Sequence, residues 1–492
     1  MSRAAQQATA IVIIAILFFL AVACGPKTGD QMPITTKSEE ALETFNKGRS
    51  LAERLRGYEA REYFQEAVDL DSNFALAHIY LAFTQPTNRE VVASLEQAVA
   101  LKDKVSEGER IWIEALQAGM NGDNAGQETL LVKLSDMYPN DPWARSQLGN
   151  FRFGQQRYDD AIAIYQDVIQ KNPDFTQPYN MLGYCYRYMS DYTEAEKYFQ
   201  EYAKLIPKDP NPYDSYADLL TEMGQYTESI ELYRKALANN SRFMPSHLGI
   251  AHNLNLLDKH DEARDYLQGV YRKALNNQQR RDLLYATAIS WADEGYLDAA
   301  LEVMQERLVL VAQDNDTAVM SQTLATMGII NVEAGAADAA EQKYHEAVEL
   351  VLNSGLSDDV KNNARRSQYY YDCRVALVRN DVDSAAKLVD EYQRLALITN
   401  NPNTIRLVHQ VRGMIALQRN EFALAAAELE KSDLQSSYNL YRLGIAYRES
   451  GDVERAREMF VEASKARMVN SLSYAFCRKQ VTAALAALDQ QL

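Results

Sequence analysis

Histidine is the residue type in this sequence best suited to metal chemistry, and its spacing predicts no metal-dependent hydrolysis. A zinc hydrolase helix carries H-E-x-x-H, in which two histidines bind the metal and the glutamate acts as a base. His345 and Glu346 begin such a pattern, but Glu349 stands where the second histidine is needed. His247 and His252 are five residues apart, which is about 140° around a helix, so they do not share one metal-facing side. We predict no metal site.

The common motifs of nucleotide binding and covalent catalysis are missing from the sequence. It has no G-x-x-x-x-G-K-[ST] phosphate loop, no G-x-S-x-G nucleophile turn and no C-x-x-C redox pair. We therefore predict that the chain is not an enzyme and uses no cofactor.

Composition indicates a folded, helical chain. Of 492 residues, 47% are hydrophobic, which is enough to bury a large apolar surface. Lys and Arg number 51 against 68 Asp and Glu, giving a net charge of −17 that would repel the phosphates of nucleic acid. We expect no nucleic acid partner. Only 21 Gly and 12 Pro serve the whole length, which favours an all-α fold with short connections.

The first 23 residues are interpreted as a signal peptide. The apolar run from Ile11 to Ala23 has 13 residues, about 20 Å as a helix, which is short of the ~30 Å hydrocarbon core of a bilayer. Residues 21–24, Ala-Val-Ala-Cys, resemble the lipobox of bacterial lipoproteins, and this resemblance implies that Cys24 carries a lipid. Ala21 stands where that family usually has Leu, so ordinary cleavage and an uncleaved anchor remain alternatives.

The resemblance also implies a location. Gly25 follows the cysteine where lipoproteins of the inner membrane often have Asp, which favours the outer membrane, with the chain facing the periplasm. Residues 24–38 lack helical periodicity, and we interpret them as a lipidated N-terminus followed by a flexible tether. The folded body would then stand slightly off the bilayer.

Beyond the tether, small and bulky residues recur every 34 positions. Within each unit the two small residues lie 12 apart, and the bulky residue follows four later on the same helix face. These spacings resemble the tetratricopeptide repeat, a pair of helices that cross where side chains are small. Four columns keep the period: Pro139, Pro173, Pro207 and Ser241; Gly149, Gly183, Ala217 and Ala251; Ala161, Ala195, Ser229 and Ala263; Tyr165, Phe199, Tyr233 and Leu267.

The resemblance implies a superhelical solenoid of helix pairs, because a short pair buries its apolar stripe only against a neighbouring pair. We predict about twelve units: divergent repeats over 39–139, a regular array over 140–277, longer divergent repeats over 278–436, and a last repeat with a capping helix over 437–492. In the third region the small residues Ala300, Ala340, Ala385 and Ala425 are 40, 45 and 40 apart, so those repeats have longer helices or longer loops.

In this family the first helix of each pair lines a concave groove that binds a partner. Carried over by position, the resemblance implies eight groove residues: Asn150, Asn180, Tyr184, Arg187, Asp214, Asp218, His252 and Asn255. Asp214 and Asp218 are four apart on one helix face and could receive a basic peptide or, with His252, a cation. A solvated acidic face is the preferred interpretation. Ser146 replaces the lysine of the basic clamp found in chaperone-binding repeats.

Three cysteines follow Cys24, at 185, 373 and 477, and an odd set cannot all pair. They lie several repeats apart, whereas a disulfide needs Cα atoms within about 7 Å. We expect buried thiols, with Cys373 as a small apolar filler.

These features together predict a non-catalytic scaffold or adaptor, anchored to the bacterial envelope by lipid and binding a partner peptide or helix in its groove. An alternative is a regulatory or accessory subunit of an envelope enzyme such as a cell-wall hydrolase, a protease or a kinase. Neither prediction identifies the partner.

Overall fold

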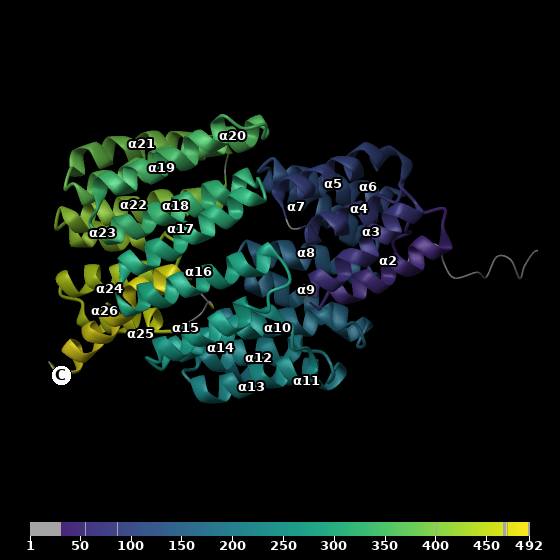
Figure 1. Cartoon of the computed structure of the whole chain (residues 1–492), viewed down its shortest axis with the longest axis horizontal. Helices are drawn as coiled ribbons and strands as arrows, with labels where there is room; N and C mark the ends of the chain where they lie inside the picture. Colours follow the sequence, from purple (N-terminus) through teal and green to yellow (C-terminus); the bar gives the residue numbers. More distant parts are fainter. Residues whose placement is uncertain are drawn as a thin grey trace, which may run out of the picture.

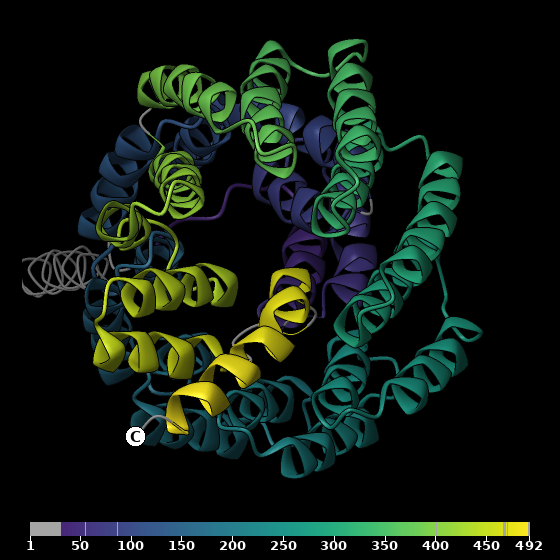
Figure 2. The ribbon, with the colours of Figure 1, turned by 90° about the vertical axis from the view of Figure 1, so that its left-hand side faces the viewer.

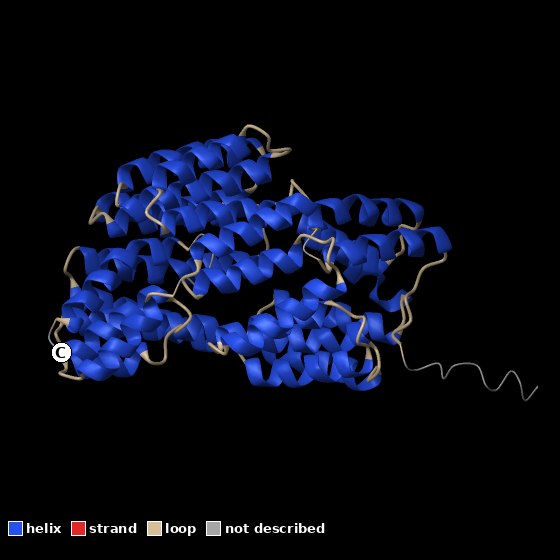
Figure 3. Ribbon diagram, turned by 90° about the horizontal axis from the view of Figure 1, so that it is seen from below, coloured by secondary structure: helices blue, strands red, loops and turns tan. Residues whose placement is uncertain are grey.

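The computed structural model describes residues 31–54, 56–85, 87–399, 401–465, 469 and 471–490, and in these residues it contains helices and no strand (Figure 3). Twelve successive helix pairs are followed by one further helix, α26 (Leu472–Asp489). The pairs are α2 (Glu39–Ala52) and α3 (Gly57–Leu70); α4 (Ala75–Thr84) and α5 (Asn88–Leu101); α6 (Glu107–Met120) and α7 (Asn124–Met137); α8 (Pro142–Gly154) and α9 (Tyr158–Lys171); α10 (Gln177–Tyr188) and α11 (Tyr192–Leu205); α12 (Asn211–Glu222) and α13 (Tyr226–Asn239); α14 (Met244–Leu256) and α15 (His260–Tyr271); α16 (Asn277–Glu294) and α17 (Leu297–Gln313); α18 (Thr317–Glu333) and α19 (Ala337–Leu352); α20 (Asp358–Val378) and α21 (Val382–Thr399); α22 (Pro402–Gln418) and α23 (Phe422–Leu429); α24 (Ser437–Glu449) and α25 (Val453–Ala463).

The predicted all-α solenoid is therefore confirmed, including the number of units and the final helix. Between α16 and α22 the extra residues lengthen the helices, which have 16 to 21 residues, while the turns inside the pairs stay at two or three. This settles the alternative of longer helices or longer loops in favour of the helices.

The small residues that carry the 34-residue period lie where the two helices of a pair touch. A methyl group added at Gly149 would lie 2.7 Å from Cε1 of Tyr165, and one added at Gly183 would overlap Phe199. Ala161 and Ala195 are fully buried beside them. The steric reason given for the repeat, close approach at small side chains, therefore holds in this fold.

Helix starts and turns also follow from local sequence. Ser106 and Glu109 form the capping box that begins α6, with each side chain bonded to the other residue's backbone N–H. Asp141 caps α8 ahead of a proline in the first turn. Ten of the turns inside the pairs contain one residue with positive φ. These residues are Gly122, Gln156, Ser190, Gly224, Asp258, Gly295, Gly335, Asn380, Asn420 and Gly451.

The pairs wind into a coil whose successive turns touch. Figure 1 shows the coil from the side, and Figure 2 looks along it, with the helices arranged around a ring. At one seam, Asn240 donates to Glu59 over 3.1 Å, joining residues 181 positions apart. At the other seam, Gln156 donates to Asp433 over 3.2 Å, 277 positions away. The middle repeats are thus held between the two ends of the chain.

Helix α26 closes the end of the coil and also reaches across it. Its second half packs Ala484 and Leu488 against Phe460 of the last pair, as a capping helix should. Its first half packs Leu472 and Phe476 on α16, ten helices earlier in the chain. The yellow α26 accordingly lies inside the ring in Figure 2.

The interpretation of residues 24–38 as a flexible tether is wrong for residues 31–38. The Met32 N–H donates to Asp141 over 2.7 Å, the Thr35 N–H to Glu109 over 3.0 Å, and the Lys37 N–H to Asp71 over 3.0 Å. Three carboxylates on separate repeats therefore hold this segment extended along the surface. We call residues 31–38 the N-terminal strap.

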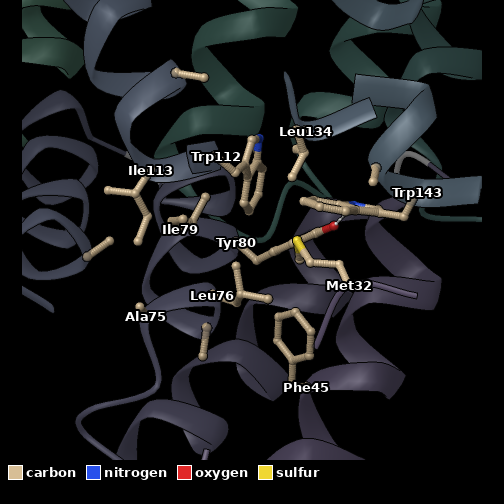
Figure 4. Packing of buried hydrophobic residues seen from close by; sticks show 14 of the residues in the cluster. Met32, Phe45, Ala75, Leu76, Ile79, Tyr80, Trp112, Ile113, Leu134 and Trp143 are labelled. Atoms are coloured by element: carbon tan, nitrogen blue, oxygen red, sulfur yellow. Dashed lines mark hydrogen bonds between the residues drawn. The ribbon is translucent and has the colours of Figure 1, made fainter. Parts of the chain in front are cut away.

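The strap adds the side chain of Met32 to the hydrophobic core of the first four repeats. Figure 4 shows Met32 beside Phe45, Tyr80 and Trp143, and the Trp143 indole donates to the Tyr80 hydroxyl over 2.6 Å. Met32 is 7% exposed. The methionine is therefore part of the fold, and burying it fixes the point at which the chain leaves the repeats.

Among the described helices none is long and apolar enough to cross a membrane. The proposed signal peptide, residues 1–23, and the proposed lipid site, Cys24, lie outside the described residues, so both stay predictions from the sequence.

Candidate functional site

The eight predicted groove residues lie on the first helices of four consecutive pairs, α8, α10, α12 and α14, as the resemblance implied. Their exposure differs from the prediction. Only Asn150, Tyr184 and Asp218 are partly exposed, and the other five are buried: Asn180, Arg187, Asp214, His252 and Asn255.

Arg187 is the centre of a charged cluster that joins α10 to α12. Its Nε donates to Oε2 of Glu222 over 2.7 Å, and Nη1 lies 3.7 Å from Oδ2 of Asp218. Burial alone would lower the pKa of Arg187, but the carboxylates of Asp218 and Glu222 raise it above its usual value. The guanidinium is thus committed to joining α10 to α12 and is not available to a partner's carboxylate.

The two aspartates of α12 belong to the same cluster. Asp218 accepts bonds from the hydroxyls of Tyr184 and Tyr233. Asp214 is 5% exposed and accepts from Oγ of Ser246 over 2.7 Å. Burial, followed by the charge of Asp218, raises the pKa of Asp214 well above its usual value. The preferred interpretation of a solvated acidic face is therefore wrong, and Asp214 cannot receive a basic peptide from solvent.

Among the described residues the cation alternative finds no support at this place. The Nε2 atom of His252 makes no hydrogen bond, and burial lowers its pKa to about 4. In the part of the chain that the structure describes, no three His, Cys, Asp or Glu side chains are placed to hold a metal ion. Nearby, Asn255 accepts from Oγ of Ser290 over 2.7 Å and so joins α14 to α16.

Asn150 and Gln177, on α8 and α10, are amide side chains of the wall that remain partly exposed. Asn150 is bonded by the Tyr165 hydroxyl over 2.7 Å and by the Gln177 amide over 2.9 Å. Oε1 of Gln177 and Oδ1 of Asn180 are buried acceptors without a hydrogen bond. Ser146, at the clamp lysine position, is buried and donates to the Pro142 carbonyl of its own helix. The basic clamp of chaperone-binding repeats is therefore not built here.

A second charged cluster, which sequence reasoning missed, lies where α26 meets α14–α16. Asp293 accepts two bonds from Arg478, over 2.8 and 2.7 Å, and lies 2.8 Å from Nε2 of His260. Arg478 also donates to Asp258 over 2.7 Å. The partners are 185 and 220 residues apart, so only the coiling of the chain brings them together.

The three cysteines that the structure describes do not form a reactive centre. Cys185, Cys373 and Cys477 are free and buried, and burial raises the pKa of each thiol to about 12. A thiol with such a pKa is a poor nucleophile at neutral pH. The prediction that Cys373 is a buried filler is confirmed.

Similarity to curated proteins is confined to short segments. The chain is 24% identical to the Hsp70-Hsp90 organizing protein of Triticum aestivum over 139 residues, and 31% identical to the protein O-mannosyl-transferase TMTC2 of Homo sapiens over 93. These segments are 28% and 18% of this chain, and they span only 24% and 11% of the two relatives.

Two solved structures are similar to parts of this chain. A tetratricopeptide repeat protein from Parabacteroides merdae is 14% identical, with a TM-score of 0.37, over 52% of this chain and 96% of that one. The human IFIT1 dimer with PPP-AAAA is also 14% identical, with a TM-score of 0.38, over 87% and 95%.

Family models identify the repeat directly. Models of the tetratricopeptide repeat match residues 152–219, 211–242 and 438–463. The first two matches cover α9 to α13, where the 34-residue period is strictest, and the third covers the last pair. The chain carries tetratricopeptide repeats in these segments.

Proposed function

We propose that this protein is a non-catalytic scaffold that holds a partner's peptide or helix against the concave wall of its repeats. The proposal is supported by the tetratricopeptide repeats and, above all, by the amide cluster on α8 and α10, where Gln177 and Asn180 have acceptors without a hydrogen bond. A polar atom buried in this way is costly unless a donor reaches it, and backbone N–H groups of a bound segment are suitable donors.

The proposed partner differs from the partners of chaperone-binding repeats, which present a terminal carboxylate to a basic clamp. Capture of a terminal carboxylate needs a free cation, whereas Arg187 is already paired with Glu222 and Ser146 is buried. We therefore propose a partner segment that is bound through its backbone and apolar side chains.

We also propose that the scaffold is held at the bacterial envelope by a lipid on Cys24, in the outer membrane and facing the periplasm. This part is supported by the sequence of residues 1–25 alone. Cys24→Ser should abolish metabolic labelling with a lipid analogue and release the protein from the membrane fraction. Retention of the label on the variant would contradict it.

Site-specific crosslinking in the native host tests the scaffold. A photoreactive residue at Asn150, on the wall, should capture one or a few defined proteins, whereas the same residue at Asp159, exposed on α9 of the same pair, should not. Equal capture at both positions would contradict a wall-specific site. Capture of an envelope enzyme, with its activity altered by the scaffold, would instead favour the accessory-subunit alternative.

A further inference from the structure

The longer repeats carry helix turns that the regular repeats lack. Helix α9 ends ten residues after its small crossing residue Ala161, whereas α17 ends thirteen residues after Ala300. The first helices are extended at the same end of the pair, since α8 begins seven residues before Gly149 and α18 begins eleven residues before Gly328. The added turns form an extra layer at the edge where successive pairs are joined. The helix crossings do not need this layer, because the regular repeats cross without it.

An open apolar trough lies in this layer. Helix α18 forms its floor and the neighbouring helices α17 and α19 form its sides (Figure 1). Each helix lines the trough with residues about one turn apart, so the trough follows the helices for about two turns, roughly 10 Å. Its volume is about 710 Å³. The apolar part of its lining consists of Leu308, Val309, Ala312, Met320, Leu324 and Leu350.

The trough leaves apolar side chains in contact with solvent. Val309 is 56% exposed, and Ala312, on the added turn of α17, is exposed as well. Beneath them, Leu308, Leu324 and Leu350 belong to the hydrophobic cluster between α18 and α19, so the trough opens onto the core of these repeats. An exposed apolar surface that continues into a core is typical of a site that a second molecule covers.

The rim of the trough is negative. Glu349 lines it and is exposed, and among the described residues no Lys or Arg lies within 4 Å of its carboxylate. Glu346 also lines it and is paired with Lys343 over 2.8 Å. Helices α17 and α19 both end beside the trough, and the last carbonyls of a helix carry partial negative charge. The opposite charge at the start of α18 is already capped by Asp316. The trough therefore favours a cationic ligand.

The lining suits a helix better than an extended chain. An extended segment needs partners for its backbone N–H and C=O groups, and apolar side chains offer none. A helix satisfies its own backbone and can bury a stripe of side chains, one turn apart, between α17 and α19.

We propose that this trough is a docking site for a basic amphipathic helix of a partner protein. About two turns of that helix insert aliphatic side chains between α17 and α19, and its flanking Lys or Arg side chains reach Glu346 and Glu349. The trough lies beside second helices, whereas the wall of Asn150 and Asn180 lies on first helices. It is therefore a second binding surface, and it does not depend on the proposed function of the wall.

A synthetic helix tests the charge and the shape of the site. The probe is a short fluorescent peptide of leucine and lysine, with leucine at every third or fourth position so that one helix face is apolar. Its binding to the full chain is measured by fluorescence anisotropy. It should bind at least about tenfold more tightly than a peptide in which glutamate replaces every lysine. Equal binding of the two peptides, or no binding of either, would overturn the proposal.

Substitutions in the trough locate the binding. Glu349→Lys reverses the rim charge and Ala312→Lys places a cation in the trough, and each should weaken binding of the lysine peptide about tenfold. The matched controls Glu228→Lys and Ala238→Lys make the same changes at exposed positions of α13, a second helix of the regular repeats, and should leave binding within about threefold. All four side chains are exposed, and circular dichroism should show unchanged helicity. Equal weakening in the trough variants and the controls would show general charge attraction and would overturn the site.

Discussion

The regular repeats, α8–α15, and the longer repeats, α16–α23, solve the same packing problem with different helix lengths. In the first region helices have 12 to 14 residues, and positive-φ residues recur at 156, 190, 224 and 258. In the second region most helices have 16 to 21 residues. The positive-φ residues of the turns inside these pairs stand at 295, 335, 380 and 420. The short turn and the close crossing of the two helices beside it are the same in both regions, and the extra residues of the second region lengthen the helices.

The two regions also differ in which residues occupy the turns. The longer repeats use Gly or Asn, the types that adopt positive φ most easily. Three of the four regular repeats instead use Gln156, Ser190 and Asp258, whose side chains reach the adjacent turn of the coil, and the fourth keeps Gly224. The positive φ in the turn is therefore a requirement of the fold of each pair. The side chain at that position can in addition bond the adjacent turn of the coil.

Alanine at the crossing glycines should have the largest effect and should act equally in both regions. Gly183→Ala would push a methyl group into Phe199, and Gly328→Ala would push one to 2.5 Å from Cε1 of Tyr344. Each should lower the free energy of unfolding by about 2–3 kcal/mol, measured by urea unfolding with circular dichroism. Gly154→Ala, with nothing near its added methyl, is the control and should be neutral or gain about 0.5 kcal/mol. A much smaller cost at Gly328 would show that the longer repeats pack differently.

Breaking a buried ion pair should cost more free energy of unfolding in the regular repeats than in the longer repeats. Glu222→Gln removes the shorter of the two ion pairs of the buried Arg187 guanidinium, leaving Asp218 at 3.7 Å, and should cost about 3 kcal/mol. Glu333→Gln should cost less, because the Arg374–Glu333 pair is longer, at 3.3 Å, and the glutamate is 15% exposed. The double variant Arg187→Met with Glu222→Met should cost less than Glu222→Gln. Equal costs for the two single Gln variants would remove this distinction.

Acid should weaken the regular region through His252. Its pKa falls to about 4 on folding from an ordinary 6.5, so between these values the unfolded chain binds the extra proton and stability falls as the pH drops. From pH 7 to pH 5 this costs about 2 kcal/mol. His252→Leu should remove that part of the pH dependence, measured by urea unfolding at both values. Parallel profiles for the two proteins would show that His252 is not the titrating group.

Glycine in the turns should have the smallest effect. Gln156→Gly relaxes φ but loses the bond to Asp433, so we expect a net gain below about 0.5 kcal/mol. In an Asp433→Ala background, where that bond is already lost, the same change should gain about 1 kcal/mol. Asn420→Gly should be near neutral in either background. Equal gains at Gln156 in both backgrounds would show that the contact with Asp433 contributes nothing.

Much of the fold could be predicted from the sequence because its information is local. Residues that must be small at the crossings, such as Gly149 and Gly183, repeat at a fixed step, and that step implies the helix pair. Whether the longer units had longer helices or loops stayed open, since both give the same spacing between small residues. The strap was missed because residues 31–38 are held extended by carboxylates of other repeats, and such a segment has the same aperiodic sequence as a tether.

The candidate site was predicted less well. The first-helix positions were right, but the sequence could not show that Asp214 would be covered by the next repeat, where Ser246 bonds it. Arg478 was missed because its partner Asp293 lies 185 residues away, and a periodic pattern gives no contact at such a separation. The place of a residue within its repeat can therefore be predicted from the sequence, whereas its contacts with another turn of the coil cannot.

The N-terminal strap also sets the orientation of the whole molecule relative to its start. Seven peptide units separate Cys24 from Gln31, so a group attached to that cysteine stays within about 25 Å of Gln31. The strap ends against the first four repeats, at the opposite end of the long axis from α22–α26 (Figure 1). A chain held at Cys24 therefore keeps its first repeats close to the point of attachment. Its last repeats, α22–α26, lie farthest from that point and face an incoming binding partner.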